Sequence, residues 1–238
     1  MSLELLPGSY CGEAPGPDLV WASWNFDPVV LAALLTLTIF LRHKPPGLAA
    51  VAVLAVAFVS PLCALSVGLF SARVVHHVLL VAVAAPLLAA ALPRRRLFGS
   101  MPLHFLVSTA ILWAWHLPAA YDLALRDIGV YWMMQVTLLG SATLFWRAVL
   151  ANGDAVGGVL WSMAGLIQMG LLGAILTLAP VVLYDAHQQM PLQWGLMPLE
   201  DQQLGGLIMW VPAMLPYIAV LALLARRAWN SGRGPASA

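Results

Sequence analysis

Two adjacent histidines, His76 and His77, stand with Arg73 near the start of the long apolar stretch 71–88. A stretch of this kind is typical of a membrane-spanning helix, and a charged side chain at the centre of such a helix costs about 2.5 to 3.5 kcal/mol. Ionisable groups in these helices therefore face protein or a cavity and often mark a functional site. The histidine pair is the first place where the sequence predicts a function.

Histidine and methionine side chains gather at one end of the apolar stretches in this chain. Four of the six histidines fall at this end, together with Met134, Met209 and Cys63. Imidazole and thioether groups suit copper, and thioether and thiolate groups favour Cu(I). The alternative is that these histidines only form hydrogen bonds and that the methionines only fill the core. The predicted metal ligands are His77, His116, His76, Met134 and His187.

Helical geometry limits how these side chains can share one pocket. His77 stacks on Arg73, four residues earlier, whereas His76 and His77 point about 100° apart, so both can line one pocket only if it is wide. The positive charge of Arg73 disfavours a bound cation unless an acid pairs with it. The acids that could do so are Asp122, Asp127 and Asp201.

Composition places the chain among membrane proteins. Of its 238 residues, 62% are hydrophobic and 9% are charged, whereas a soluble domain has roughly 25% charged residues. Its mean hydropathy is +0.89. The formal net charge of +1 gives no strongly basic chain, so we expect no nucleic-acid partner. Because no nucleophile elbow, phosphate-binding loop or zinc-protease motif is present, we also expect that the protein is not an enzyme.

The first residues and the two cysteines say little about chemistry. Residues 1–24 lack the basic start, apolar middle and small-residue cleavage site of a signal peptide, so we expect a polar lead that is retained on the outer side. Cys11 and Cys63 allow at most one disulfide and form no CxxC metal or redox motif.

Seven stretches are apolar enough to cross a membrane, which takes about 20 residues. The sequence therefore predicts an all-α polytopic membrane protein, a bundle of about seven transmembrane helices. We expect a polar lead over 1–24, a single transmembrane helical domain over 25–228 and a short cytoplasmic tail over 229–238. The seven stretches are 27–41, 48–70, 74–92, 102–117, 130–150, 159–184 and 204–225.

The distribution of Lys and Arg predicts the orientation of the chain. With the N-terminus outside and the C-terminus in the cytoplasm, nine of the eleven Lys and Arg residues fall on the inner side, as the positive-inside rule requires. Only Arg73 and Arg126 fall outside. The longest outer loop, 184–203, is predicted to be a folded lid or a re-entrant segment, with a plain connector as the alternative.

Polar and small residues late in the chain predict how its helices pack. Asp201 is placed to cap the seventh helix, and Gly205 with Gly206 permits the close approach of a neighbouring helix. Gly165 and Gly173 give the sixth stretch a small-residue packing face, to which no chemistry is assigned.

Four segments of the chain stand together in an order that is found in one known family. They are WNFDPVVLAALL from Trp24, SPLCALSVGLFSARVVHHVLLVAVAAPLL from Ser60, WAWHLPAAYDLAL from Trp113 and LEDQQLGGLIMWVP from Leu199. Together they resemble the CtaG-type cytochrome c oxidase assembly factors, which are bacterial integral membrane proteins linked to copper delivery to haem-copper oxidases. The similarity runs from Trp24 to about Leu224.

This resemblance implies an assembly factor for a haem-copper terminal oxidase, which helps deliver or insert copper into subunit I from the outer side of the bacterial cytoplasmic (inner) membrane. It implies transient copper binding and, as partners, subunit I, other assembly factors and the lipid bilayer, with a homodimer left open. His77 matches a family histidine in the third span, and His116 matches the histidine of the HLP motif. Where members often carry histidines, this chain has Arg73, Met134 and Gln135. Either His76 and Met134 substitute for them, or this member has another role.

Two other classes of protein fit the same residues. One is a structural accessory subunit or scaffold of an oxidase complex that binds no metal. The other is a membrane haem b protein, in which His77 and an outer histidine such as His116 ligate the iron.

Overall fold

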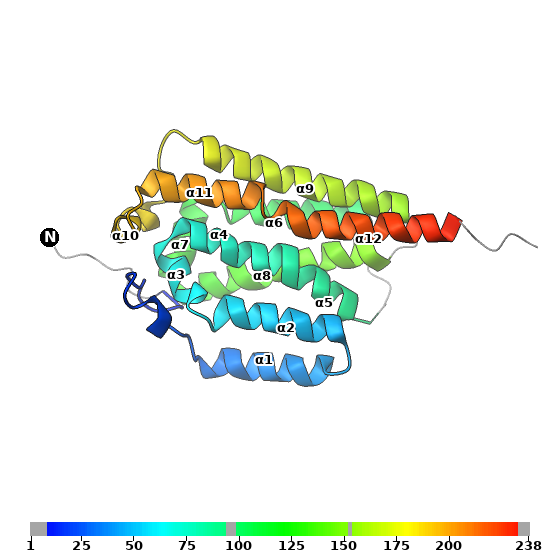
Figure 1. Cartoon of the computed structure of the whole chain (residues 1–238), viewed down its shortest axis with the longest axis horizontal. Helices are drawn as coiled ribbons and strands as arrows, with labels where there is room; N and C mark the ends of the chain where they lie inside the picture. Colours follow the sequence, from blue (N-terminus) through cyan, green and yellow to red (C-terminus); the bar gives the residue numbers. More distant parts are fainter. Residues whose placement is uncertain (1–8, 94–98, 152–153, 233–238) are drawn as a thin grey trace, which may run out of the picture.

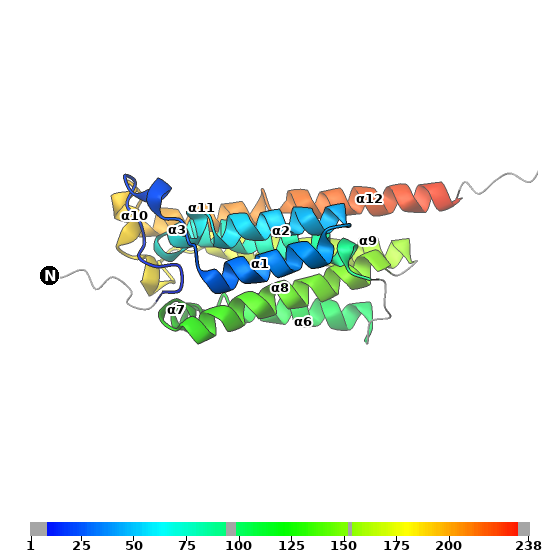
Figure 2. The same ribbon diagram turned by 90° about the horizontal axis from the view of Figure 1, so that it is seen from below.

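Helices lie side by side along the long axis of the molecule (Figures 1 and 2). The computed structural model describes residues 9–93, 99–151 and 154–232, and these ranges contain helices and connections but no strand. The predicted all-α class is therefore confirmed for the described chain. The helices are η1 (Val20–Ala22), α1 (Pro28–Leu41), α2 (Pro45–Phe58), α3 (Leu62–Gly68), α4 (Phe70–Val78), η2 (Leu79–Ala84), α5 (Ala85–Ala91), α6 (Met101–Ala114), α7 (Pro118–Arg126), α8 (Ile128–Ala151), α9 (Ala155–Leu178), η3 (Asp185–His187), α10 (Met190–Gln193), α11 (Pro198–Trp210) and α12 (Met214–Gly232).

Four helical segments in the described chain are long and apolar enough to cross a membrane. The number rises to six if two bent pairs, α2 with α3 and α6 with α7, each count as one span. Helix α1 has 14 residues and is apolar, but it is shorter than the four spanning segments. The count of seven spans and the outward N-terminus stay predictions, as does the division of the chain at residues 24 and 228.

Several predicted stretches are interrupted or end early in the structure, and proline explains most of these helix breaks. Helix α6 ends at Ala114, and α7 begins at Pro118 after a bend of 73°. Helix α9 ends at Leu178, well before the predicted 184, because the residue before Pro180 is extended. Proline disfavours the helical conformation in the residue that precedes it, so a run that is uniformly apolar still ends there.

The span that carries the histidine pair changes its winding in the middle. Residues Leu79–Ala84 form a π-helix between α4 and α5. Pro86 follows it and has no N–H with which to continue the regular hydrogen bonds. The wider turn leaves the Val81 carbonyl to accept a hydrogen bond from Trp146 Nε1 on α8, at 2.9 Å. The wide turn thus ties this span to α8 just inside the histidine pair.

Helices α9 and α11 approach each other closely through glycine. A Cβ on Gly173 would lie 2.8 Å from the Gly206 carbonyl oxygen, and one on Gly206 would lie 2.5 Å from Thr177 N. The predicted close approach at Gly206 is confirmed. The predicted role of Asp201 as the cap of its own helix is wrong, because its carboxylate accepts from the N–H groups of Phe70 and Ser71 and so caps α4.

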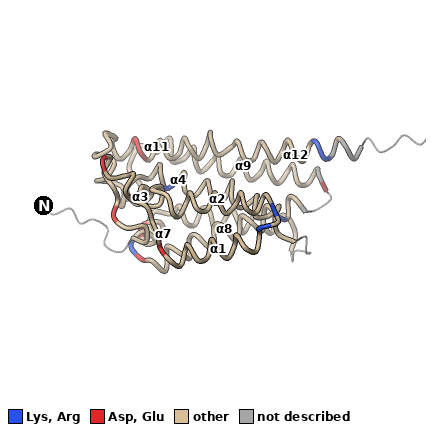
Figure 3. Tube along the Cα trace, turned by 60° about the horizontal axis from the view of Figure 1, so that its bottom comes forward, with Lys and Arg blue, Asp and Glu red and all other residues tan. Residues whose placement is uncertain are grey.

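Opposite charges gather at the two ends of the bundle (Figure 3). Most acidic residues lie at the end formed by α3, α7, α10 and the residues before α1, which we call the N-terminal end. Most basic residues lie at the opposite end, as the topology prediction requires. Four of the predicted inner basic residues lie outside the described residues, namely Arg94, Arg95, Arg96 and Arg233.

Part of the predicted polar lead packs against the N-terminal end. Tyr10 stacks on Tyr131 with ring centroids 5.1 Å apart and meets Trp132 edge-on at 4.8 Å. Cys11 forms a disulfide with Cys63, which is the one bridge that two cysteines allow. Residues 1–8 of the lead and residues 233–238 of the predicted tail lie outside the described residues.

Candidate functional site

Arg73 lies on α4 and is fully buried. Its Nε donates to the Ser66 carbonyl at 3.0 Å, and its Cζ lies 5.4 Å from the centroid of the Tyr131 ring. Its two terminal nitrogens have no hydrogen-bond partner in normal geometry among the described residues. The sequence offers Asp122, Asp127 and Asp201 as partners. Asp127 and Asp201 both cap helices by accepting from backbone N–H groups, and Oδ1 of Asp122 has no hydrogen-bond partner among the described residues. In the described part of the chain, Arg73 is a buried cation without a counter-ion.

Three histidines form a row next to Arg73, on the side that faces away from the N-terminal end of the bundle. The ring centroids of His76 and His77 lie 5.8 Å apart, and those of His77 and His116 lie 6.0 Å apart. All three side chains are buried. Neither ring nitrogen of His76 or His77 has a hydrogen-bond partner among the described residues. Buried polar groups normally have such a partner, so these nitrogens are available to a ligand.

His116 is held in one tautomer. Its Nδ1 lies 2.7 Å from the Leu112 carbonyl oxygen, which can only accept. Nδ1 therefore carries the hydrogen in the neutral ring, and Nε2 keeps its lone pair. Ligating histidines commonly bond a carbonyl through the nitrogen that does not hold the metal. His116 thus has the orientation of a ligand.

Helix α8 faces the row with Met134 and Gln135, which are both buried. Tyr131 on this helix touches Arg73. Helices α4 and α8 run in the same direction (Figure 1). His77 follows Arg73 by four residues and Gln135 follows Tyr131 by four residues, so Gln135 lies at the level of His77. Neither amide atom of Gln135 has a hydrogen-bond partner among the described residues. We call the four side chains with unpartnered polar atoms the open cluster; its members are Arg73, His76, His77 and Gln135.

His187 differs from the other predicted ligands because both of its nitrogens have partners. Nδ1 lies 3.0 Å from the Gly68 carbonyl and Nε2 lies 2.7 Å from the Tyr121 hydroxyl, so Nδ1 donates and Nε2 accepts. Burial lowers the pKa of His187 from 6.5 to about 3, with a smaller contribution from the charge of Arg73. The loop 184–203 that carries it is folded, with η3 and α10 within it. A metal would reach His187 only by breaking one of these hydrogen bonds.

The spacing of the row suits an ion held between two imidazole rings. A metal bonded at about 2.0 Å to one nitrogen of each ring would place the ring centroids roughly 6 Å apart. No group of three or more His, Cys, Asp or Glu side chains in the described residues is placed to hold a metal. Cu(I) needs fewer ligands than such a group supplies, because it accepts two nitrogen ligands. The sulfur of Cys63 is bonded to Cys11 and is not a thiolate ligand.

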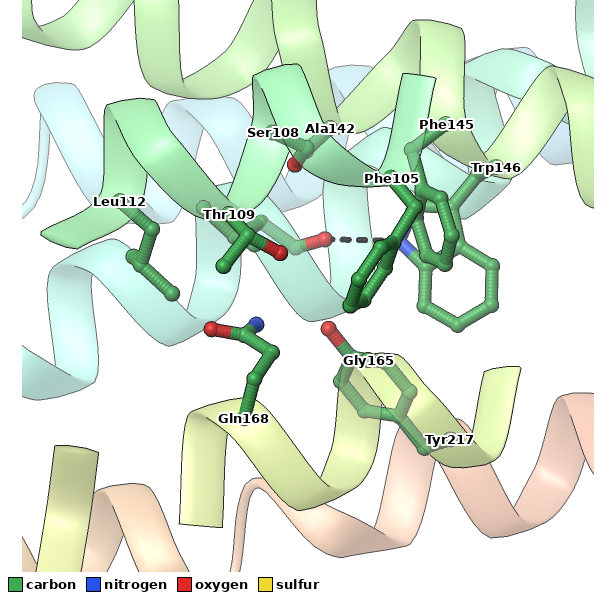
Figure 4. Close-up of a pocket in the computed structure, with 11 residues that line it drawn as sticks. Phe105, Ser108, Thr109, Leu112, Ala142, Phe145, Trp146, Gly165, Gln168 and Tyr217 are labelled. Atoms are coloured by element: carbon green, nitrogen blue, oxygen red, sulfur yellow. Dashed lines mark hydrogen bonds between the residues drawn. The ribbon is translucent and has the colours of Figure 1, made fainter. Parts of the chain in front are cut away.

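A small pocket lies one helical turn inside the row (Figure 4). It has room for about one water molecule. Val81 and Leu112 line it, each one turn from a histidine of the row, and Gln168, Thr109 and Tyr217 point polar groups toward it. Trp113 Nε1 donates to the side-chain carbonyl oxygen of Gln168 at 3.0 Å. This bond fixes the orientation of the amide, so that its N–H groups point away from Trp113. The pocket therefore adds a few polar groups to the interior of the bundle near the row.

Sequence reasoning missed the tyrosines that fix this region. Tyr184 donates its hydroxyl to the His116 carbonyl at 2.9 Å, and Tyr121 bonds His187. Both tyrosine rings are buried and lie 4.5 Å apart. The available signal is that a tyrosine in an apolar stretch needs a partner for its hydroxyl, but the sequence does not say which one.

Comparison with known families covers three of the four segments that the sequence shares with one of them, and the segment from Trp24 lies before the matched part. The family model of the cytochrome c oxidase caa3 assembly factors (Caa3_CtaG) matches residues 48–231. The chain belongs to this family. No curated protein and no solved structure matches it. The open cluster and all five predicted ligands lie within the part that matches the caa3 assembly factors, whereas α1 and Cys11 precede it.

Proposed function

We propose that this caa3 assembly factor helps deliver or insert copper into subunit I of a haem-copper terminal oxidase, from the outer side of the bacterial cytoplasmic membrane. The observation that carries the proposal is the pair His77 and His116. Two buried imidazole rings lie 6.0 Å apart, one with both nitrogens unpartnered and the other with Nε2 left free by its bond to Leu112.

The chemistry that these residues support is binding and exchange of a soft ion. Neutral imidazole nitrogens bind copper, and the Met134 thioether on the facing helix favours Cu(I). Burial of all three groups excludes water from the ion. Release to another protein then needs only the replacement of one copper–ligand bond by another, with no covalent turnover of the assembly factor.

Two features support a position on the outer side. The described basic residues lie mostly at the end opposite the row (Figure 3), which favours that end as the cytoplasmic one. The Cys11–Cys63 disulfide lies at the N-terminal end, and disulfides persist in oxidising compartments outside the cytoplasm.

Copper analysis of the purified full-length protein tests the proposal. Cells are grown with added copper, and the detergent-solubilised protein is analysed for metal content and optical absorbance. We expect bound copper in the wild type and at least about a tenfold weaker affinity in the double variant His77→Ala with His116→Ala, as for other metal sites that lose ligands. His43→Ala is the matched control, because His43 is exposed in the turn between α1 and α2.

The outcomes separate the three classes of function. Copper retained by the double variant overturns the assignment of the site. A Soret band in the wild-type spectrum favours a haem b protein instead. Co-purification with the oxidase, with neither copper nor haem bound, favours the scaffold.

A further inference from the structure

The uncompensated charge of Arg73 requires an explanation of its own. A guanidinium group keeps its proton in proteins, so Arg73 cannot become neutral as a buried lysine can. Among the described residues, no group, carboxylates included, accepts a hydrogen bond in normal geometry from its two terminal nitrogens. A buried charge without a partner costs several kcal/mol. Water could fill the hydrogen bonds, but it would leave the charge uncompensated.

The groups around Arg73 are suited to an anion. Tyr131 lies against the guanidinium group without neutralising it. At the next turn of the same helix, the Gln135 amide nitrogen is buried and has no hydrogen-bond partner within the described ranges. Guanidinium and amide N–H groups are donors only, and buried donors that lack a protein acceptor are suited to an anion. The same site offers the lone pairs of His76 and His77 to a cation.

Charge also limits the form in which copper can enter. Cu(I) beside Arg73 would place two positive charges in a buried site with no described acid paired to either. A monovalent anion bound with the metal reduces this total to one. We propose that Arg73 and Gln135 bind one small monovalent anion of the chloride class, and that copper enters the row together with it. The second half of this statement rests on the copper role proposed above, whereas the anion site does not.

The anion site is tested on copper-free, full-length protein in detergent. Thermal unfolding is measured in sodium chloride and in sodium gluconate at equal ionic strength, because gluconate is too large for a single buried anion site. With chloride at about ten times its dissociation constant, we expect the unfolding midpoint to rise by about 3 to 6 °C. The same midpoint in both salts overturns the proposal.

Two variants assign the effect to Arg73. Arg73→Gln keeps donors but removes the charge, and we expect it to lose the difference between chloride and gluconate. Arg126→Gln removes an exposed arginine at the end of α7 and should keep the difference. A chloride effect that survives in Arg73→Gln overturns the assignment. If that variant does not fold, the wild-type comparison of the two salts still decides whether a small-anion site exists.

Copper binding in the two salts tests the second half. Cu(I) is titrated into wild type and Arg73→Gln, which experience the same chloride complexes in solution, so their difference reports the site. We expect chloride to strengthen copper binding at least about fivefold in the wild type relative to the variant. An equal effect of chloride in the wild type and in Arg73→Gln overturns joint entry and leaves the copper role standing. No copper in either salt overturns the copper role and leaves the anion site standing.

Discussion

Two buried polar clusters adjoin each other on α4 and differ in whether their atoms have partners. The first, which we call the closed cluster, joins α4 to α11 and, through His187 of η3, joins α7 to α3 by hydrogen bonds that use its side-chain atoms. In the open cluster, by contrast, the terminal nitrogens, imidazole nitrogens and amide atoms have no hydrogen-bond partner in the part of the chain that the structure describes. The closed cluster consists of Ser71, Tyr121, His187 and Asp201.

This difference separates structure from function within one helix. A buried polar network whose atoms are all paired stabilises a single arrangement, whereas each unpaired buried group costs about 1 to 3 kcal/mol. The closed cluster therefore holds the N-terminus of α4 in place. Because α4 is fixed in this way, the open cluster beside it has a rigid support. Its donors and lone pairs stay free for a ligand.

Of the substitutions in the closed cluster, we expect Asp201→Ala to lower the stability of the protein most. Asp201→Ala removes the acceptor for the N–H groups of Phe70 and Ser71 and for the Ser71 hydroxyl. Because several buried donors lose their partner at once, we expect a loss of stability of about 3 kcal/mol or more. Thermal unfolding in detergent measures it. Asp185→Ala, at an exposed acid in η3, should change the midpoint little, and an Asp201→Ala variant as stable as this control contradicts the role of the cluster.

Two buried glutamines give the sharpest matched comparison. Gln202 accepts from Leu183 N at 2.7 Å and donates to the Val181 carbonyl at 3.1 Å, whereas Gln135 has no hydrogen-bond partner among the residues described. We expect Gln202→Met to lower stability by about 2 kcal/mol, because it strands two backbone groups. Gln135→Met should leave stability unchanged or raise it by about 1 kcal/mol, because it replaces an unpaired amide with an apolar chain of similar size. Unfolding of both variants in gluconate provides the measurement, and equal losses would remove the distinction between the clusters.

The smallest expected effect is a pH dependence from His187. Its pKa is about 3 in the folded protein and about 6.5 in an unfolded chain. The unfolded state therefore binds the proton first, and stability is fully present above about pH 6.5 and falls as the pH drops toward 3. From pH 7.5 to pH 5.5 this group alone should lower stability by about 1.4 kcal/mol. His187→Gln should show a correspondingly smaller drop, and an unchanged drop would assign the titration to other groups.

The helices and their gross polarity could be predicted because they depend on local composition. Long apolar runs gave the helical class, and the close approach at Gly206 followed from the absence of a side chain. The gathering of His76, His77 and His116 followed from their places within the predicted runs. Each of these properties is decided by residues that are near one another in the sequence.

The partners of the buried polar groups could not be predicted in the same way. Asp201 could cap either its own helix or another one, and only the packing of α11 against α4 brings it to Phe70. The sequence predicts His187 as a metal ligand, whereas in the structure its two nitrogens bond Gly68 and Tyr121. Hydrogen bonds between residues far apart in the sequence leave no local pattern, so the division into an open and a closed cluster required the structure.

The Cys11–Cys63 disulfide gives the chain a covalent ring that contains α1 and α2. Arg42 is exposed in the turn between these helices, at the end remote from the disulfide. A protease that cuts after Arg42 would open the backbone without releasing a fragment, because the piece with Cys11 stays attached through Cys63. The cut molecule would therefore migrate as one species on a non-reducing gel and as two after reduction, and the helix that precedes the family-matched region would remain bound to it.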